Sequence, residues 1–219
     1  MADHEAYGDR RDAMSGGSAG AGGDSAGSSG TARTSGAHRP TLVVVSGPPG
    51  SGKTTMAGLL AQALPCPLVS RDAINEGIFH TFGHDLAVAD KESVARLTFD
   101  AFFQTIDLLL SSKVTVVAEA AFQHRRWRLG LDSLKAEADI KVVHCVIDLE
   151  LARRRVTERR RERPDSPSSR RAELARHTGT GARTVSGFEE VSLAVPTLRV
   201  ATAKGYDPGV EAIIDFIRS

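Results

Sequence analysis

Short apolar runs and longer stretches with helical periodicity alternate along the chain from residue 41 onwards. The apolar runs have the length of buried strands, and the longer stretches carry apolar residues three and four positions apart, as helices do when one face is buried. The predicted strands cover 41–45, 65–70, 113–122, 140–148 and 197–201, and the predicted helices cover 56–64, 73–82, 91–112, 123–138 and 210–217. This alternation predicts an α/β domain.

The first 39 residues lack this pattern. They are rich in Gly, Ala and Ser and contain almost no branched or aromatic side chain. Such a segment cannot bury enough apolar surface to offset the entropy lost on ordering. We therefore predict a disordered tail at 1–39 and one α/β domain, of about 180 residues, at 40–219.

Charge and composition narrow the range of partners and locations. The formal net charge is +1, so overall charge predicts neither a nucleic-acid nor a membrane partner. No apolar run approaches the roughly 18 residues of a membrane span, and the tail lacks the apolar core of a secretory signal. Cys66 and Cys145 lie at predicted strands or their edges, and we expect both to be free thiols. These observations predict a cytoplasmic protein.

The segment that follows the first predicted strand matches the pattern G-x-x-x-x-G-K-[ST] at every fixed position. Its glycines allow the backbone N–H groups to surround a phosphate, and the next helix directs its positive end at the same anion. Lys53 is expected to reach the β- and γ-phosphates, and the Thr54 hydroxyl to bind Mg²⁺. No N-K-x-D signature for guanine is present, which favours ATP. The candidate nucleotide-binding residues are Gly47, Pro48, Pro49, Gly50, Ser51, Gly52, Lys53, Thr54 and Thr55.

Asp72 lies just beyond the second predicted strand. In open parallel sheets, ligands bind beyond the carboxyl ends of the strands, so Asp72 is expected near the phosphate loop. Two roles fit this position equally well. Asp72 caps the following helix, or it accepts a proton from a substrate hydroxyl that attacks the γ-phosphate.

Glu119 closes the third apolar run and occupies the position of the Walker B acid, which holds Mg²⁺. The usual residue there is aspartate, so glutamate is a departure. Ala120 follows in place of the second acid that mechanical ATPases use to activate water. The pair therefore indicates a metal site but not an efficient ATPase.

Residues 153–176 contain ten arginines and four acids, and Pro164 and Pro167 divide the segment into two predicted helices. A solvated helical hairpin and a nucleic-acid surface are alternatives. We favour a closing lid, at about 150–180, whose arginines neutralise phosphate charge in a transition state. Arg155 and Arg159 lie one helical turn apart, so both are predicted to point at the same ligand.

The phosphate loop, the Ser70-Arg71-Asp72 sequence, the strand that ends at Glu119 and the arginine-rich segment together resemble a known group. The group consists of small P-loop kinase-like proteins with AAA-type ATP-binding domains. It includes polynucleotide 5′-kinases, chloramphenicol phosphotransferase and zeta-toxin sugar kinases. The similarity covers residues 41–219.

The resemblance implies a five-stranded parallel sheet of order 2-3-1-4-5, with helices on both faces and a helical lid. It also implies ATP and Mg²⁺ as donor and a hydroxyl group as acceptor. Lys53 and Thr54 match the group's phosphate and magnesium residues, and Asp72 matches its catalytic base. Arg155 and Arg159 match its paired lid arginines.

The sequence therefore predicts an ATP-dependent kinase that phosphorylates a hydroxyl of a small molecule or nucleotide-like acceptor. Asp72 is the predicted base, and Lys53, Arg155 and Arg159 stabilise the transferred phosphoryl group. Nucleic acid is a possible but not a favoured partner, through polynucleotide 5′-hydroxyl kinase activity. A third reading, from another class, is a nucleotide-controlled ATPase or switch that binds a protein partner.

Overall fold

The computed structural model describes residues 39–82, 91–122, 124–162, 188, 190 and 192–219. Most of the predicted tail, the linker after residue 82 and the second predicted lid helix lie outside these residues. The chain divides into Met1–Gly36 and Ala37–Ser219, and the fold below is that of the second unit. Within the described part, none of the helices has the length and apolar character that crossing a membrane requires.

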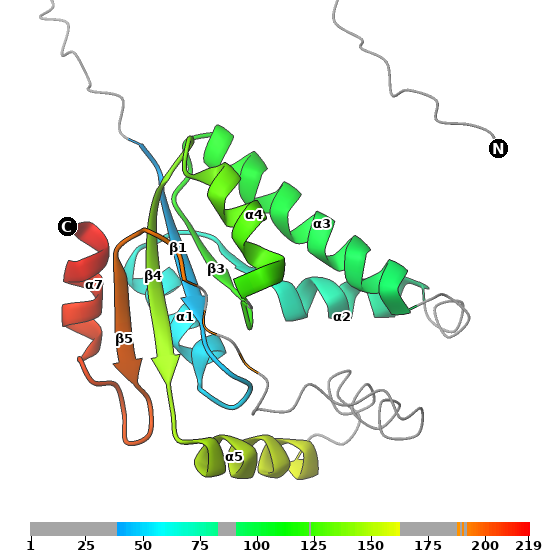
Figure 1. Cartoon of the computed structure of the whole chain (residues 1–219), viewed down its shortest axis with the longest axis vertical. Helices are drawn as coiled ribbons and strands as arrows, with labels where there is room; N and C mark the ends of the chain where they lie inside the picture. The colour runs from blue at the N-terminus through cyan, green and yellow to red at the C-terminus, as the bar shows by residue number, and fades with distance from the viewer. Residues whose placement is uncertain (1–38, 83–90, 123, 163–187, 189, 191) are drawn as a thin grey trace, which may run out of the picture. The chain divides into compact units, whose positions relative to one another are not determined.

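A parallel five-stranded sheet forms the centre of the domain (Figure 1). Its spatial order is β2-β3-β1-β4-β5, and every neighbouring pair is parallel. The predicted fold and strand order are confirmed. The strands are β1 (Thr41–Ser46), β2 (Leu68–Ser70), β3 (Val116–Glu119), β4 (Asp139–Val146) and β5 (Thr197–Ala201).

Helices cover both faces of the sheet. One apolar cluster joins the sheet to α1 and α7, and another joins its opposite face to α3 and α4. Figure 1 shows α5 beyond the carboxyl end of β4, and α2 beside α3. The helices are α1 (Lys53–Ala63), α2 (Arg71–Phe82), α3 (Lys91–Ser111), α4 (His124–Leu134), α5 (Leu149–Glu162) and α7 (Val210–Arg218).

The position of β1 in the middle of the sheet explains why its residues 42–45 are all apolar. Leu42 and Val44 pack into the cluster under α3 and α4, whereas Val43 and Val45 pack into the cluster under α1 and α7. Successive side chains of a strand point to opposite faces, so a strand covered on both sides must be apolar at every position. All four side chains are fully buried. This central strand leads directly into the predicted phosphate loop.

Aromatic side chains fill the space between α3 and α4. The Trp127 ring lies 4.9 Å from that of Phe99 and 4.7 Å from that of Phe122, between ring centroids. Phe102 and Phe103 complete the group, with centroids 5.6 and 5.7 Å from that of Trp127. The aromatic residues of the long helix therefore belong to the core rather than to a ligand pocket.

Gly130 of α4 lies against this group, and we expect its replacement by alanine to destabilise the protein. A Cβ atom at Gly130 would lie 2.5 Å from the Phe103 ring, which neighbouring rings confine. Overpacking of about 1–3 kcal/mol should outweigh the roughly 1 kcal/mol that alanine gains in a helix. Urea unfolding measures the result. Gly58→Ala in α1 is the matched control, because no atom lies within 4 Å of its added Cβ, and it should stabilise. A gain in stability for Gly130→Ala would contradict the tight packing.

Two strands begin later than predicted. The second begins at Leu68 rather than at residue 65, since Pro65 and Pro67 have no N–H to donate to a sheet. The third begins at Val116 rather than at residue 113. Lys113 has a left-handed backbone, with φ of 62°, and its N–H donates to the carbonyl of Leu110 in the turn that ends α3.

Arg39, predicted as the last residue of the tail, contacts the folded domain. Its guanidinium donates to the carbonyl oxygens of Lys135 and Ala138, at 2.7 and 3.1 Å, and pairs with Asp139 at 3.6 Å. These contacts tie the start of the domain to the connection between α4 and β4. They lie at the amino-terminal ends of the strands, whereas the phosphate loop lies at the carboxyl end of β1.

Candidate nucleotide-binding site

The loop between β1 and α1 has the backbone geometry of an anion-binding turn. Gly50 and Gly52 have φ angles of 85° and 81°, which side chains of L-residues rarely allow. Gly52 is the N-cap of α1, and the N–H of Met56 donates to its carbonyl. The N–H groups of the first α1 residues therefore have no partner within the helix. Because a Cβ at Gly52 would meet no atom within 4 Å, the space in front of them is open.

A hollow of about 350 Å³ lies at this loop. Such a volume is at the lower end of the range for small-molecule sites. A larger hollow, of about 560 Å³, lies along the first turns of α5 but contains none of the loop residues. The first hollow is the one that chemistry favours, because backbone N–H groups and cations meet there. It is lined by Gly50, Gly52, Lys53, Thr54, Thr55, Arg159 and Glu162.

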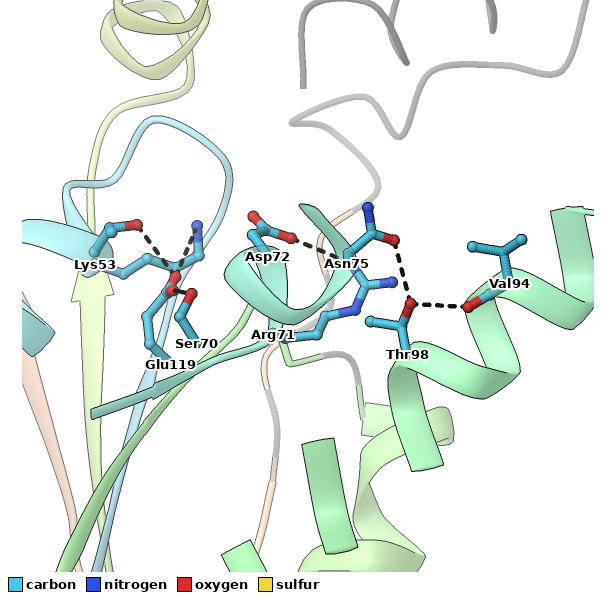
Figure 2. Close-up of polar contacts among 9 residues, drawn as sticks. Lys53, Ser70, Arg71, Asp72, Asn75, Val94, Thr98 and Glu119 are labelled. Carbon is cyan, nitrogen blue, oxygen red and sulfur yellow. Dashed lines mark hydrogen bonds and ion pairs between the residues drawn. The ribbon is translucent and has the colours of Figure 1, made fainter. Parts of the chain in front are cut away.

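Glu119 lies at the centre of a polar cluster next to the loop (Figure 2). Its side chain is 1% exposed and receives three contacts, two from α1 and one from β2. The Lys53 ammonium lies 3.5 Å from Oε1, and the Thr54 hydroxyl donates to the same oxygen at 3.3 Å. The Ser70 hydroxyl donates to Oε2 at 2.8 Å. A buried carboxylate is costly unless it is paired and hydrogen-bonded, and Glu119 is both.

The residues that would hold a magnesium ion fit such an ion. Thr54 and Glu119 supply a hydroxyl and a carboxylate within hydrogen-bond distance of each other, and oxygen ligands are those that Mg²⁺ prefers. Among the described residues, no group of three His, Cys, Asp or Glu side chains could hold a metal alone. An ion here would need water and phosphate oxygens as its remaining ligands, which is the usual arrangement for Mg²⁺.

Asp72 lies in the first turn of α2, which begins at Arg71. The N-cap alternative for Asp72 is thus not what the structure shows, because the residue is already inside the helix. Its side chain is 71% exposed, and its carboxylate pairs with Arg71 at 3.2 Å. Asp72 follows Ser70, which contacts Glu119, by only two residues. Figure 2 shows the Asp72 side chain at the start of α2, next to the cluster formed by Lys53, Ser70 and Glu119.

The structure separates the two candidate lid arginines. Arg159 lines the hollow at the phosphate loop. Arg155 instead donates a hydrogen bond of 3.0 Å to the carbonyl of Ala203, in the connection between β5 and α7. The prediction that both point at one ligand is not met in this arrangement, because Arg155 is already engaged elsewhere.

Helix α5 also lies in direct contact with the loop. A Cβ atom at Gly50 would lie 2.5 Å from the carbonyl oxygen of Ala152 and 3.1 Å from the Val156 side chain. Glycine at this position is therefore required both by the backbone angle and by the close approach of the helix.

Two polar residues of the site were not among the predicted ones. Ser70 contacts the metal-site carboxylate, and Arg71 pairs with Asp72 while its own side chain is only 10% exposed. Both belong to the Ser-Arg-Asp sequence, so the motif contained them. Their roles depend on contacts with other segments, which the motif alone does not specify.

Cys145 lies beneath the loop but is not a reactive group. Burial raises the pKa of its thiol to about 12; the Lys53 charge lowers this pKa and the Glu119 charge raises it, both to a smaller extent. The thiol is therefore protonated at neutral pH and a poor nucleophile. Both cysteines are free, as predicted.

A parallel sheet of order 2-3-1-4-5 with a glycine-rich loop and Lys-Thr at the start of α1 defines a P-loop NTPase. A family model described as an AAA domain matches residues 42–179, more than half of the 219 residues. The chain belongs to this AAA domain family, and the resemblance to small P-loop kinase-like proteins is confirmed. Comparison with curated proteins finds no match.

Solved structures share the fold at low sequence identity. One of them is a protein from Chloroflexus aurantiacus j-10-fl whose own assignment as a kinase is inferred. It is 23% identical, with a TM-score of 0.64, over 84% of this chain and 96% of that one. A sugar kinase from Janibacter sp. HTCC2649 is 15% identical, with a TM-score of 0.55, over 83% and 95%. The APS kinase of Mycobacterium tuberculosis, in complex with AMPPNP and APS, is 19% identical, with a TM-score of 0.55, over 83% and 99%.

Proposed function

We propose that the protein is an ATP-dependent kinase that transfers the γ-phosphate of ATP to a hydroxyl group of a small molecule. The loop, the Lys53 ammonium and Arg159 supply donors for the triphosphate. Thr54 and Glu119 would hold a magnesium ion. The family match and the kinases among the structures that share the fold support this class of reaction.

One observation carries the proposal: a solvent-facing carboxylate adjoins the phosphate-binding cluster. Asp72 is 71% exposed and lies two residues after Ser70, whose hydroxyl contacts Glu119. Aspartates are mostly exposed, so position rather than exposure distinguishes Asp72: it follows the strand whose last residue, Ser70, pairs with Glu119. A base that must meet an incoming hydroxyl has to be accessible in this way.

The proposed reaction assigns one task to each group. Asp72 accepts the proton of the acceptor hydroxyl while the oxygen of that hydroxyl forms a bond to the γ-phosphorus. The bond between that phosphorus and the oxygen bridging to the β-phosphate breaks, and ADP leaves. Lys53 and Arg159 stabilise the negative charge of the transferred group. Bound magnesium would supply further charge neutralisation at the phosphate oxygens.

The experiment that tests the proposal is a transfer screen with γ-labelled ATP. The acceptors are nucleosides, sugars, oligonucleotides and compounds of the aminoglycoside and phenicol types. We expect a labelled small-molecule product that requires Mg²⁺. Label released only as inorganic phosphate across the whole panel would contradict kinase activity and favour a nucleotide-controlled switch.

A second candidate, polynucleotide 5′-hydroxyl kinase, is favoured by the charge of α5. This helix carries six arginines against three acids. Two of its arginines already form ion pairs with glutamates of the same helix, at 2.7 and 3.7 Å. Label on the oligonucleotides, with binding that weakens steeply as salt rises, would establish this candidate instead.

Glu119→Gln should uncouple ATP binding from magnesium. In the structure Lys53 is paired with Glu119, so a phosphate that recruits Lys53 must break that contact. Glutamine keeps the shape but removes the charge. We expect metal-free ATP to bind the variant more tightly, on the order of tenfold, because a charge-assisted contact no longer competes. Added Mg²⁺ should no longer improve affinity. Calorimetric titration with and without Mg²⁺ measures both effects, and an unchanged magnesium dependence would remove Glu119 from the metal site.

A further inference from the structure

We propose that Arg71 is a positioning residue, which holds the Asp72 carboxylate in the orientation that accepts the proton of the acceptor. The inference deepens the proposed kinase function and rests on it. The inference gives a function to Arg71, a charged side chain that belongs to neither the phosphate loop, the metal site nor the lid.

Arg71 is an unusual residue for its position because it is buried and charged. Its side chain is only 10% exposed, although arginine is rarely buried without a charged partner. Within the described part of the chain, the ion pair that the guanidinium makes is with Asp72, between Nη1 and Oδ1 at 3.2 Å. The buried cation is therefore matched to the carboxylate that we assign as the base.

The two partners differ greatly in freedom. The Asp72 side chain is 71% exposed, so packing alone restricts its rotamers little. Arg71 is held on the buried side of α2. The Arg71 side chain is already ordered by its burial, so its ion pair can fix the Asp72 carboxylate without a further loss of Arg71 conformational entropy.

The face of α2 that carries Arg71 is buried. Asn75 lies one helical turn further along α2 and is also buried. Thr98 of α3 is fully buried, with its hydroxyl 3.3 Å from Asn75 Oδ1 and 2.8 Å from the carbonyl of Val94. Figure 2 shows the Arg71 guanidinium joined to the Asp72 carboxylate. Arg71 thus lies on the face of α2 that Asn75 and Thr98 tie to α3.

The geometry separates this role from ATP binding. The hollow at the loop is lined by residues of the loop, α1 and α5 but not by Arg71. Loss of Arg71 should therefore misplace the base and leave the nucleotide in place. A misplacement of about 1 Å at a reacting group lowers a rate by roughly a hundredfold.

The test compares Arg71→Gln and Arg71→Lys with wild type, using γ-labelled ATP and the panel compound that wild type phosphorylates fastest. We expect Arg71→Gln to lower kcat by about ten- to a hundredfold with the KM for ATP within about twofold. Lysine should restore part of the lost rate, because it keeps the charge but not the planar fork. Arg128→Gln is the matched control, since Arg128 is exposed and pairs with Asp132 at 3.4 Å in α4. It should leave kcat unchanged.

A double-variant cycle distinguishes positioning from a general structural role. If Arg71 acts through Asp72, adding Arg71→Gln to Asp72→Asn should lower the residual rate less than twofold. An equal fall in both backgrounds, or a rise in the KM for ATP, would overturn the inference while the kinase function stands. Transfer to no compound by wild type would instead refute the proposed function, and the inference with it.

Discussion

Asp72→Asn should abolish most phosphoryl transfer while ATP binding changes by less than about twofold. The carboxylate is the proposed proton acceptor, and asparagine has a similar shape but does not accept the proton. General base catalysis contributes about 10²- to 10⁴-fold, so kcat should fall within that range. ATP affinity should persist, because Asp72 is not among the residues that line the hollow at the loop. Initial rates with γ-labelled ATP and a separate binding titration measure the two quantities.

Glu76→Gln provides the control for this prediction. Glu76 lies one turn after Asp72 on the same face of α2 and is also exposed, so the change removes a comparable charge from the same helix. Its rate should match wild type. If Asp72→Asn transferred phosphate as fast as wild type, Asp72 would have no part in the reaction and another base would have to be sought.

Arg159→Ala should lower kcat by about a hundredfold or more, whereas Arg155→Ala should lower it by less than about tenfold. Arg159 lines the hollow at the loop, and a guanidinium placed on a transferred phosphoryl group contributes several orders of magnitude in related chemistry. Arg155 is engaged by the carbonyl of Ala203. Its loss should chiefly loosen the attachment of α5 to the connection between β5 and α7.

Steady-state rates for both alanine variants and for Arg159→Lys test this asymmetry. Lysine keeps the charge but loses the bidentate fork, so it should recover only part of the rate. Equal and severe losses at both positions would show that Arg155 leaves Ala203 and joins the phosphate during the reaction. The sequence-based expectation of a paired role would then hold for the working enzyme.

The fold was predictable because its main determinants are local. Strand β1 is apolar at all four positions from 42 to 45 because both faces of the sheet are covered, and the glycine pattern after the strand identifies the loop. The position of Asp72 beyond β2 also follows from the rule that parallel strands present their carboxyl ends at one edge. Strand ends were less predictable, since Pro65 and the left-handed Lys113 shorten two apolar runs that continue in the sequence.

The contacts of the site could not be predicted from the sequence, because they join segments far apart in the chain. Glu119 meets Lys53 and Ser70, which are 66 and 49 residues away. Helical periodicity places Arg155 and Arg159 on one face of α5 but cannot say which neighbour each will meet. The packing of α2 against α3, which joins Asn75 to Thr98, is likewise encoded by no local pattern.

The missing side chain at Gly50 allows the backbone of α5 to approach the backbone of the nucleotide loop closely. If binding of an anion moves the loop, we therefore expect the helix that carries Arg159 to move with it. By reciprocity, a change in that helix should alter the affinity of the loop for the anion. Substitutions on the outer surface of α5 should accordingly register in ATP affinity, even where they touch no phosphate.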